Sequence, residues 1–190
     1  MSTGADAIDP AVARRLGLER RRGLPDPERR LRTDALMGHL EGLTELGGPG
    51  RVATYVALAD EVDVTAPAER WRAAGWVLHL PRLMGGGEME FARFGPGDEL
   101  VANRYGIGEP TGPAVGVADL DVVIVPCVAV DDNGTRVGFG AGYYDRALAA
   151  TPRPFLVGVA FEVQRFTSIE RRPWDVPLDV VVTDAGVLRP

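Results

Sequence analysis

Lysine is absent from this 190-residue sequence, and all 21 of its basic residues are arginines. A lysine Schiff base and a lysine general base are therefore excluded, and any ion pair with a phosphate must use a guanidinium group. Cysteine is nearly absent too: Cys127 is the only one, which excludes an intrachain disulfide and a cluster of thiolate metal ligands. The two histidines, His39 and His79, are far apart in the sequence and have no evident partner, so we interpret both as structural.

Long apolar runs and a positive net charge are also missing. No segment approaches the roughly 20 apolar residues that span a bilayer, and the acidic N-terminus lacks the apolar core of a signal peptide. The net charge of −6 argues against a nucleic-acid-binding surface. With 45% hydrophobic and 25% charged residues, the composition is typical of a globular protein. We expect a cytoplasmic monomer that binds neither membranes nor nucleic acid.

Apolar, β-branched runs alternate along the chain with helical patterns. This alternation predicts an α/β fold, a three-layer sandwich in which helices flank a mostly parallel central sheet. The length suits a single domain covering residues 1–190, with residues 1–9 as a flexible tail. The expected strands are 51–57, 76–81, 88–94, 120–126 at the sheet centre, 154–161 and 180–183. The expected helices begin at Pro10 with Asp9 as the cap, at Pro27 with a buried Leu31, Leu36, Met37 and Leu40 stripe, at Pro67, and at Tyr143.

The most distinctive segment is a glycine-rich loop, GTRVGFGAGYYDRAL at residues 134–148. Gly138, Gly140 and Gly142 alternate within it, which lets the backbone approach a ligand closely. A strand precedes the loop and a helix is expected near its end, where free N–H groups and the helix dipole favour a phosphate. The alternative is a tight turn after a β-hairpin, with Tyr143 and Tyr144 in the core.

Two aspartates could extend this loop into a metal site. Asp145 follows Gly142 by three residues, and Asp175 lies near the C-terminus. Two carboxylates are sufficient for Mg²⁺ when phosphate oxygens and water complete its shell. The alternatives are that Asp145 pairs with Arg146 or caps a helix, and that Asp175 is an exposed loop acid. A covalent nucleophile is not evident, because the sequence has no G-x-S-x-G motif and we interpret Cys127 as a small apolar residue that fills space in the core.

Two longer segments, DVVIVP at 121–126 and DDNGTRVGFGAGYYDR at 131–146, resemble the signature of the 5-formyltetrahydrofolate cyclo-ligase (5,10-methenyltetrahydrofolate synthetase) family. The likeness covers most of the chain, because further family segments follow in order: ADEV (59–62), LPR (80–82), MEF (89–91), GIGEP (106–110), AFEVQ (160–164) and WDVPLD (174–179). The resemblance implies an α/β enzyme that uses ATP and Mg²⁺ to convert 5-formyltetrahydrofolate to 5,10-methenyltetrahydrofolate. In that family ATP phosphorylates the formyl oxygen, N10 of the folate attacks, and phosphate leaves.

The resemblance also implies roles for individual residues. For ATP it implies Arg15, Arg136, Gly138, Phe139, Gly140, Ala141, Gly142, Tyr143 and Tyr144. For the folate it implies Val56, Glu61, Phe139, Gly140, Ala141, Gly142 and Tyr143. The catalytic residues would be Arg136, Tyr143 and Tyr144, and Mg²⁺ would be held by Asp145 and Asp175.

The sequence departs from the family pattern at three positions. Ala11 stands where a lysine is usual, Ala141 where a lysine or glycine is frequent, and Trp174 where a histidine usually precedes the second metal aspartate. Two other hypotheses therefore stay open: a folate- or nucleotide-binding homologue with weakened catalysis, and a sugar-phosphate enzyme that uses the same loop. Glu61 and the Tyr-Tyr-Asp match argue against the second of these.

Overall fold

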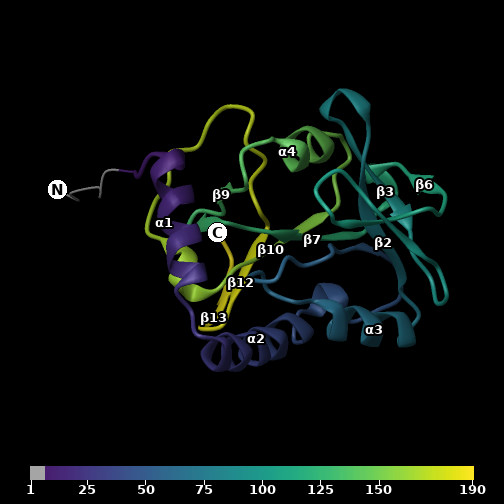
Figure 1. Cartoon of the computed structure of the whole chain (residues 1–190), viewed down its shortest axis with the longest axis horizontal. Helices are drawn as coiled ribbons and strands as arrows, with labels where there is room; N and C mark the ends of the chain where they lie inside the picture. The colour runs from purple at the N-terminus through teal and green to yellow at the C-terminus, as the bar shows by residue number, and fades with distance from the viewer. Residues whose placement is uncertain (1–6) are drawn as a thin grey trace.

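A central sheet of eight strands organises the computed structural model, which describes residues 7–190 (Figure 1). Its strands are β1 (Arg51–Ala53), β2 (Val77–Leu83), β3 (Met89–Arg93), β6 (Ala114–Val115), β7 (Val122–Pro126), β10 (Phe155–Val159), β12 (Val180–Thr183) and β13 (Gly186–Leu188). The spatial order is β13-β12-β10-β7-β1-β2-β3-β6. The five strands from β12 to β2 are parallel, whereas β13, β3 and β6 are antiparallel to their neighbours. The prediction of a mostly parallel sheet with residues 120–126 near its centre is confirmed.

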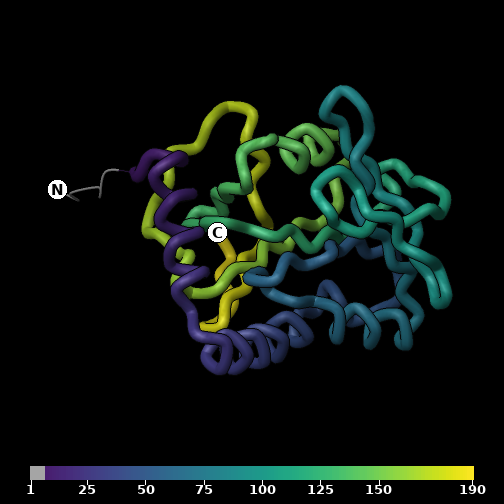
Figure 2. The backbone as a smooth tube through the Cα atoms, viewed as in Figure 1, coloured from purple at the N-terminus to yellow at the C-terminus, as the bar shows by residue number. Residues whose placement is uncertain are grey.

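Helices cover both faces of this sheet. On one face lie α2 (Asp26–Glu41) and α3 (Thr65–Ala73), and on the other lies α4 (Tyr143–Leu148) (Figures 1 and 2). Helix α1 (Pro10–Arg22) packs against a small sheet formed by β8 (Ala129–Asp131), β9 (Arg136–Val137) and β11 (Arg165–Phe166). A separate hairpin, β4 (Leu100–Ala102) with β5 (Gly108–Pro110), lies beside β2. The chain therefore forms the predicted three-layer sandwich.

The central strand β7 shows why the sequence favours this fold. Its side chains alternate between two cores: Val122 and Ile124 pack with α2 and α3, whereas Val123 and Val125 pack with Leu148 of α4. A parallel strand covered on both faces needs apolar residues at every position, which explains its unbroken apolar sequence.

Four details differ from the sequence-based expectations. The expected 51–57 strand ends at Ala53, because Tyr55 leaves the sheet and its hydroxyl donates to the Val62 carbonyl at 2.6 Å. Leu31 is 71% exposed, since it precedes Leu36 by five residues and so lies roughly 140° around helix α2. The α2 helix begins at Asp26 with Pro25 as its cap residue. The α3 helix begins at Thr65, two residues before the expected Pro67.

The predicted flexible tail is only partly within the described chain. Residues 1–6 lie outside the described residues. Ile8 forms a bridge with Ile169, and its amide donates to the Ser168 carbonyl at 3.0 Å. Asp9 caps α1 as predicted, because its carboxylate accepts from the Ala11 amide at 2.8 Å. Ile8 and Asp9, which we expected in the tail, are therefore held by hydrogen bonds to the fold.

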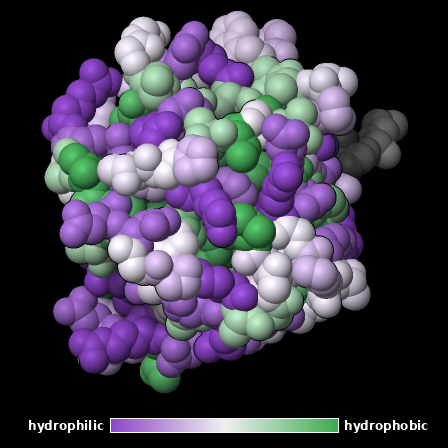
Figure 3. All heavy atoms as spheres, turned by 90° about the vertical axis from the view of Figure 1, so that its right-hand side faces the viewer, coloured by the Kyte–Doolittle hydropathy of each residue, from purple (hydrophilic) through white to green (hydrophobic). Residues whose placement is uncertain are grey.

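The face that carries β3 and β6 is mostly hydrophilic, with small apolar groups scattered across it (Figure 3). Within residues 7–190, no helix has both the length and the apolar character needed to cross a membrane.

The thiol of Cys127 provides a test of the core at the end of β7. Cys127 is 4% exposed, and burial raises the pKa of its thiol to about 12. Since the thiolate is the reactive form, we expect the native protein to be inert to an aromatic disulfide reagent near pH 8. The urea-unfolded protein should release one thiol equivalent within minutes under the same conditions. Native labelling at the unfolded rate would contradict this burial.

Candidate active site

The glycine-rich loop connects the β8–β9 hairpin to helix α4. The loop therefore follows a β-hairpin, as in one interpretation of the sequence, and precedes a helix, as in the other. The turn before it is closed by Asp131, whose Oδ1 accepts from the Asn133 and Thr135 amides at 2.9 and 2.8 Å. Gly140 and Gly142 have φ values of 104° and 69°, a region that side chains disfavour. The sequence thus places glycine where the backbone must turn into α4.

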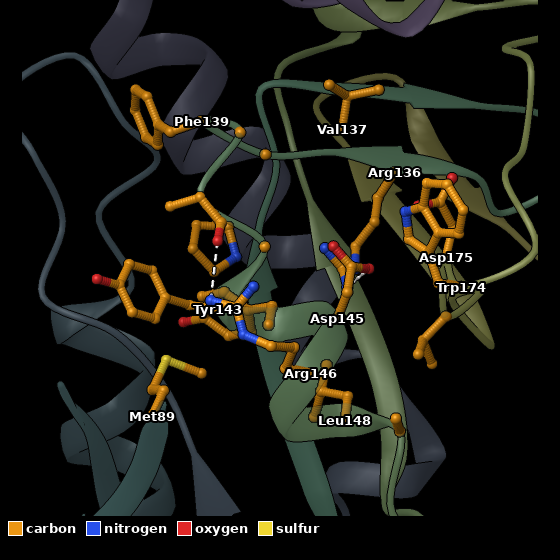
Figure 4. A pocket seen from close by; sticks show the side chains of 18 of the residues that line it. Met89, Arg136, Val137, Phe139, Tyr143, Asp145, Arg146, Leu148, Trp174 and Asp175 are labelled. Atoms are coloured by element: carbon orange, nitrogen blue, oxygen red, sulfur yellow. Dashed lines mark hydrogen bonds and ion pairs between the residues drawn. The ribbon is translucent and has the colours of Figure 1, made fainter. Parts of the chain in front are cut away.

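This loop lines a cavity of about 1180 Å³ (Figure 4). The other walls come from the start of α1, the β2–β3 and β4–β5 regions, α4 and residues 170–177. The sequence-predicted site residues that line it are Arg136, Gly138, Phe139, Gly140, Ala141, Gly142, Tyr143, Tyr144, Asp145 and Asp175. Residues as far apart in the chain as Pro10 and Pro177 therefore meet at one cavity.

Three sequence-predicted site residues do not line this cavity: Arg15, Val56 and Glu61. The Arg15 side chain is 66% exposed and pairs with Glu19 on the outer face of α1 at 3.4 Å. Val56 is only partly buried in the loop after β1. Glu61 belongs to the same loop and is buried, and this burial raises the pKa of its carboxyl group against the opposing effects of the Leu58 amide and Arg21.

A buried arginine connects Glu61 to α1. Arg21 is 2% exposed and forms ion pairs with Asp60 at 3.1 Å and with Glu61 at 3.4 Å. Its guanidinium carbon also lies 5.6 Å from the centre of the Phe139 ring. Arg21 therefore stands between the glycine-rich loop and the acidic loop that carries Glu61.

Arg14 occupies the cavity wall where the sequence led us to expect Arg15. Its Nε donates to the Gly138 carbonyl at 2.7 Å, which brings the guanidinium against the glycine-rich loop. The signal that could have found it is helical spacing. Arg14 precedes Gly17 by three residues and so shares the face on which α1 packs, whereas Arg15 is turned away.

Arg136 is the most buried charge on the cavity wall. Its side chain is 4% exposed, and its Nη2 donates to Asp145 Oδ1 at 2.5 Å. Its Nε is also buried and has no hydrogen-bond partner among residues 7–190. The guanidinium group as a whole belongs to the cavity wall, where its positive charge is suited to an anionic oxygen of a ligand.

The two predicted metal aspartates lie on the same side of the cavity. Figure 4 shows Asp175 beside Trp174 on the side that also holds Arg136 and Asp145. Within the described part of the chain, no three His, Cys, Asp or Glu side chains form a metal-binding cluster. A pair of carboxylates fits Mg²⁺, which commonly takes its remaining ligands from phosphates and water.

The two tyrosines have different surroundings. The hydroxyl of Tyr144 is enclosed, and burial raises the pKa of Tyr144 well above its usual value. Tyr144 is therefore a hydrogen-bond donor at neutral pH and not a base. The Tyr143 hydroxyl accepts a hydrogen bond from Arg104 Nη2 at 2.5 Å, a contact that the sequence did not reveal.

Comparison with known proteins identifies the family. A model of the 5-formyltetrahydrofolate cyclo-ligase family matches residues 10–184, which include all of the cavity walls. This chain belongs to that family. The 5-formyltetrahydrofolate cyclo-ligase of Escherichia coli (strain K12) is 35% identical over 143 residues, covering 72% of this chain and 79% of the relative. That of Mycolicibacterium smegmatis is 33% identical over 184 residues, covering 87% and 89%.

A solved structure supports the same conclusion for this member of the cyclo-ligase family. The NMR structure of Aquifex aeolicus 5,10-methenyltetrahydrofolate synthetase matches with a TM-score of 0.81 and 36% identity, covering 95% of this chain and 92% of that one. The three departures from the cyclo-ligase pattern, Ala11, Ala141 and Trp174, all lie on the cavity wall. Trp174 is 65% exposed, and the Arg172 guanidinium carbon is 5.9 Å from its ring centre.

Proposed function

We propose that this chain is an ATP- and Mg²⁺-dependent 5-formyltetrahydrofolate cyclo-ligase. It would convert 5-formyltetrahydrofolate to 5,10-methenyltetrahydrofolate by phosphorylation of the formyl oxygen and closure by N10, with ADP and phosphate as the other products. The observation that carries the proposal is the cavity wall, where the family's glycine-rich loop brings the nearly buried Arg136 together with Asp145 and Asp175.

The cavity has the groups that such a reaction requires. Phosphoryl transfer to an oxygen needs positioning and charge stabilisation rather than a protein nucleophile. Arg14 and Arg136 would hold phosphate oxygens, and the backbone amides of Gly138, Gly140 and Gly142 could approach them without hindrance from a β-carbon of their own. Tyr144 would donate a hydrogen bond to developing negative charge. Asp145 and Asp175 would hold Mg²⁺, which supplies further neutralisation of the phosphates when it is bound.

The pterin would extend from the glycine-rich loop toward the loop after β1. Glu61 is a buried carboxylate, and the pterin presents N–H donors that such a group can accept. Phe139, which is 53% exposed, lies on the cavity side of Arg21 and Glu61. We therefore propose that Phe139 moves when the folate binds and that Val56 and Glu61 then reach the ring.

Turnover is the direct test. Purified protein is mixed with Mg²⁺, ATP and 5-formyltetrahydrofolate, and the methenyl product is followed by its absorbance while ADP is measured in parallel. Formation of both in equal amounts is the expected result. Absence of both at saturating ATP would refute the proposal, and calorimetric folate binding without turnover would instead favour the weakened homologue that Ala11 and Trp174 suggest.

A further proposal concerns the organisation of the chain. We propose that residues 1–190 act as a single domain, which is supported by the pairing of strands from residues 51 to 188 within one sheet. The cytoplasmic location and the monomeric state remain predictions from the sequence. Light scattering after size-exclusion chromatography would test the monomer.

Neighbouring arginines on α1 give a matched pair for the ATP site. Replacing Arg14 with alanine removes a guanidinium from the cavity wall, and we expect the KM for ATP to rise about 10- to 100-fold, the range for a charged hydrogen bond. Replacing Arg15 removes only an exposed pair with Glu19 and should change KM less than about threefold. Initial rates at varied ATP would compare them. A larger effect from Arg15 would assign the ATP contact to the outer face of the helix.

A further inference from the structure

Unpaired arginines gather around the cavity. Most arginines of the chain form ion pairs with carboxylates, but eight have none among residues 7–190: Arg14, Arg20, Arg30, Arg93, Arg104, Arg146, Arg171 and Arg172. Arg14, Arg146 and Arg172 line the cavity, and Arg104 contacts the lining residue Tyr143, so half of these eight arginines lie at one site. In a chain with a net charge of −6, guanidinium groups left without partners at one place indicate an anionic ligand there.

Two of these arginines flank Tyr143. Arg104 donates to the Tyr143 hydroxyl at 2.5 Å, and the Arg146 guanidinium carbon lies 5.5 Å from the centre of the same ring. We call Arg104, Tyr143 and Arg146 the arginine rim. Figure 4 shows Tyr143 and Arg146 near Met89, on the side of the cavity away from Asp175.

The tip of the β4–β5 hairpin is built to hold Arg104 in place. Asn103 Oδ1 accepts from the amides of Tyr105 and Ile107 at 2.8 and 3.1 Å, which closes the turn around Arg104. Glu109 Oε1 accepts from Asn103 Nδ2 at 2.8 Å and from the Leu83 amide at 2.9 Å, which fastens the tip to β2. The Glu109 carboxylate on this cavity wall thus accepts hydrogen bonds from neutral donors and forms no ion pair with Arg104.

The Arg146 side chain is also held in place, and no carboxylate among residues 7–190 neutralises its charge. It donates to the carbonyls of Gly87 at 2.6 Å and Ala141 at 2.9 Å. A β-carbon at Gly87 would lie 3.2 Å from its Nη2, and one at Gly142 would lie 2.9 Å from its Nη1. Both glycines make room for the guanidinium. Carbonyl partners orient the group but leave its positive charge available to a ligand.

We propose that Arg104 and Arg146 bind the glutamate carboxylates of the reduced folate and thereby select substrates that carry this acidic tail. The inference rests on the proposed function. The two sides of the cavity divide the ligands by charge: Asp145 and Asp175 would repel a carboxylate and attract a cation, whereas the arginine rim attracts a carboxylate. The p-aminobenzoyl arm of the folate would lie between them, against Met89 and Ile107, which line the cavity.

Removal of the tail from the substrate tests the assignment. 5-Formyltetrahydropteroate has the same ring system as 5-formyltetrahydrofolate but no glutamate. For Arg104→Ala we expect KM to rise about tenfold with the folate, the lower end for a charged hydrogen bond, and less than about twofold with the pteroate. Arg30→Ala, which removes an exposed arginine of α2 on the opposite face of the sheet, should leave the preference for the folate unchanged.

Two results would overturn the proposal. Equal changes for both substrates in Arg104→Ala would mean that Arg104 acts only through Tyr143, and Tyr143→Phe, which removes the shared hydrogen bond, should then reproduce the change. No change with either substrate would also overturn it.

Calorimetry separates this inference from the proposed function. The folate and the pteroate are titrated into the parent protein and Arg104→Ala without ATP. A preference for the folate that Arg104→Ala abolishes supports the arginine rim even if no turnover is observed, and in that case the proposed function fails alone. Equal affinity of the parent protein for both ligands, or no binding of either, overturns the rim as a tail-binding site.

Discussion

Replacing Arg136 with alanine is expected to lower the rate of methenyl formation on the order of 10²- to 10³-fold, the usual effect of removing one donor that stabilises transition-state charge. The Arg136 side chain is 4% exposed, and its Nε has no partner among the described residues. A charge enclosed in this way interacts with a phosphate more strongly than a solvated one does. The loss should therefore appear in the chemical step, and single-turnover rates at saturating ATP and folate would measure it.

Because Arg136 forms an ion pair with Asp145, this experiment needs controls for protein stability and for the loss of positive charge. Loss of Arg136 leaves the Asp145 carboxylate without its 2.5 Å partner, so a stability measurement must accompany the rates. Arg136→Lys keeps the positive charge but lacks the fork of donors, and we expect a smaller loss. Arg189→Ala removes an exposed arginine that pairs with Glu45 at 2.8 Å and should leave the rate unchanged. A folded Arg136→Ala variant within about fivefold of the parent rate would contradict a role for Arg136 in the reaction.

Gly17→Ala is expected to destabilise the protein by about 1–3 kcal/mol, the usual effect of overpacking, although alanine is the better helix former by about 1 kcal/mol. A β-carbon at Gly17 would lie 2.2 Å from the Val128 carbonyl oxygen and 3.1 Å from its carbon. This carbonyl cannot move freely, because it accepts from Gln164 Nε2 at 2.8 Å. Helix α1 must therefore shift, and the shift would also move Arg14 and raise the KM for ATP.

Helix α2 offers the matched control for this substitution. Gly38 is exposed within α2, and a β-carbon there would meet nothing within 4 Å. Gly38→Ala should therefore stabilise the protein by about 0.5–1 kcal/mol. Urea unfolding of the parent and both variants would compare them. A Gly17→Ala variant as stable as the parent, with unchanged KM for ATP, would show that α1 can pack differently from the structure described.

Local patterns in the sequence were sufficient for the main helices, for most strands of the central sheet and for the loop. Strand β7 was predictable because a strand buried on both faces must be apolar throughout. The start of α1 was predictable because Asp9 and Pro10 occupy positions whose preferences depend on the nearest few residues. Gly140 and Gly142 were predictable as special positions because left-handed φ values favour glycine, and the surrounding motif identified the family.

Only the tertiary structure decided which polar side chains meet. The choice between Arg14 and Arg15 depends on the face that α1 turns to the β8–β9 hairpin, and the burial of Glu61 depends on Arg21 crossing from the same helix. The contact of Arg104 with Tyr143 joins two segments 39 residues apart. Such contacts are set by strand order and by how α1 and the β4–β5 hairpin pack on the sheet. The sequence alone determined the fold class, the glycine-rich loop and the family, because these depend on periodicity and motif. Packing between distant segments determined the charges that surround the cavity.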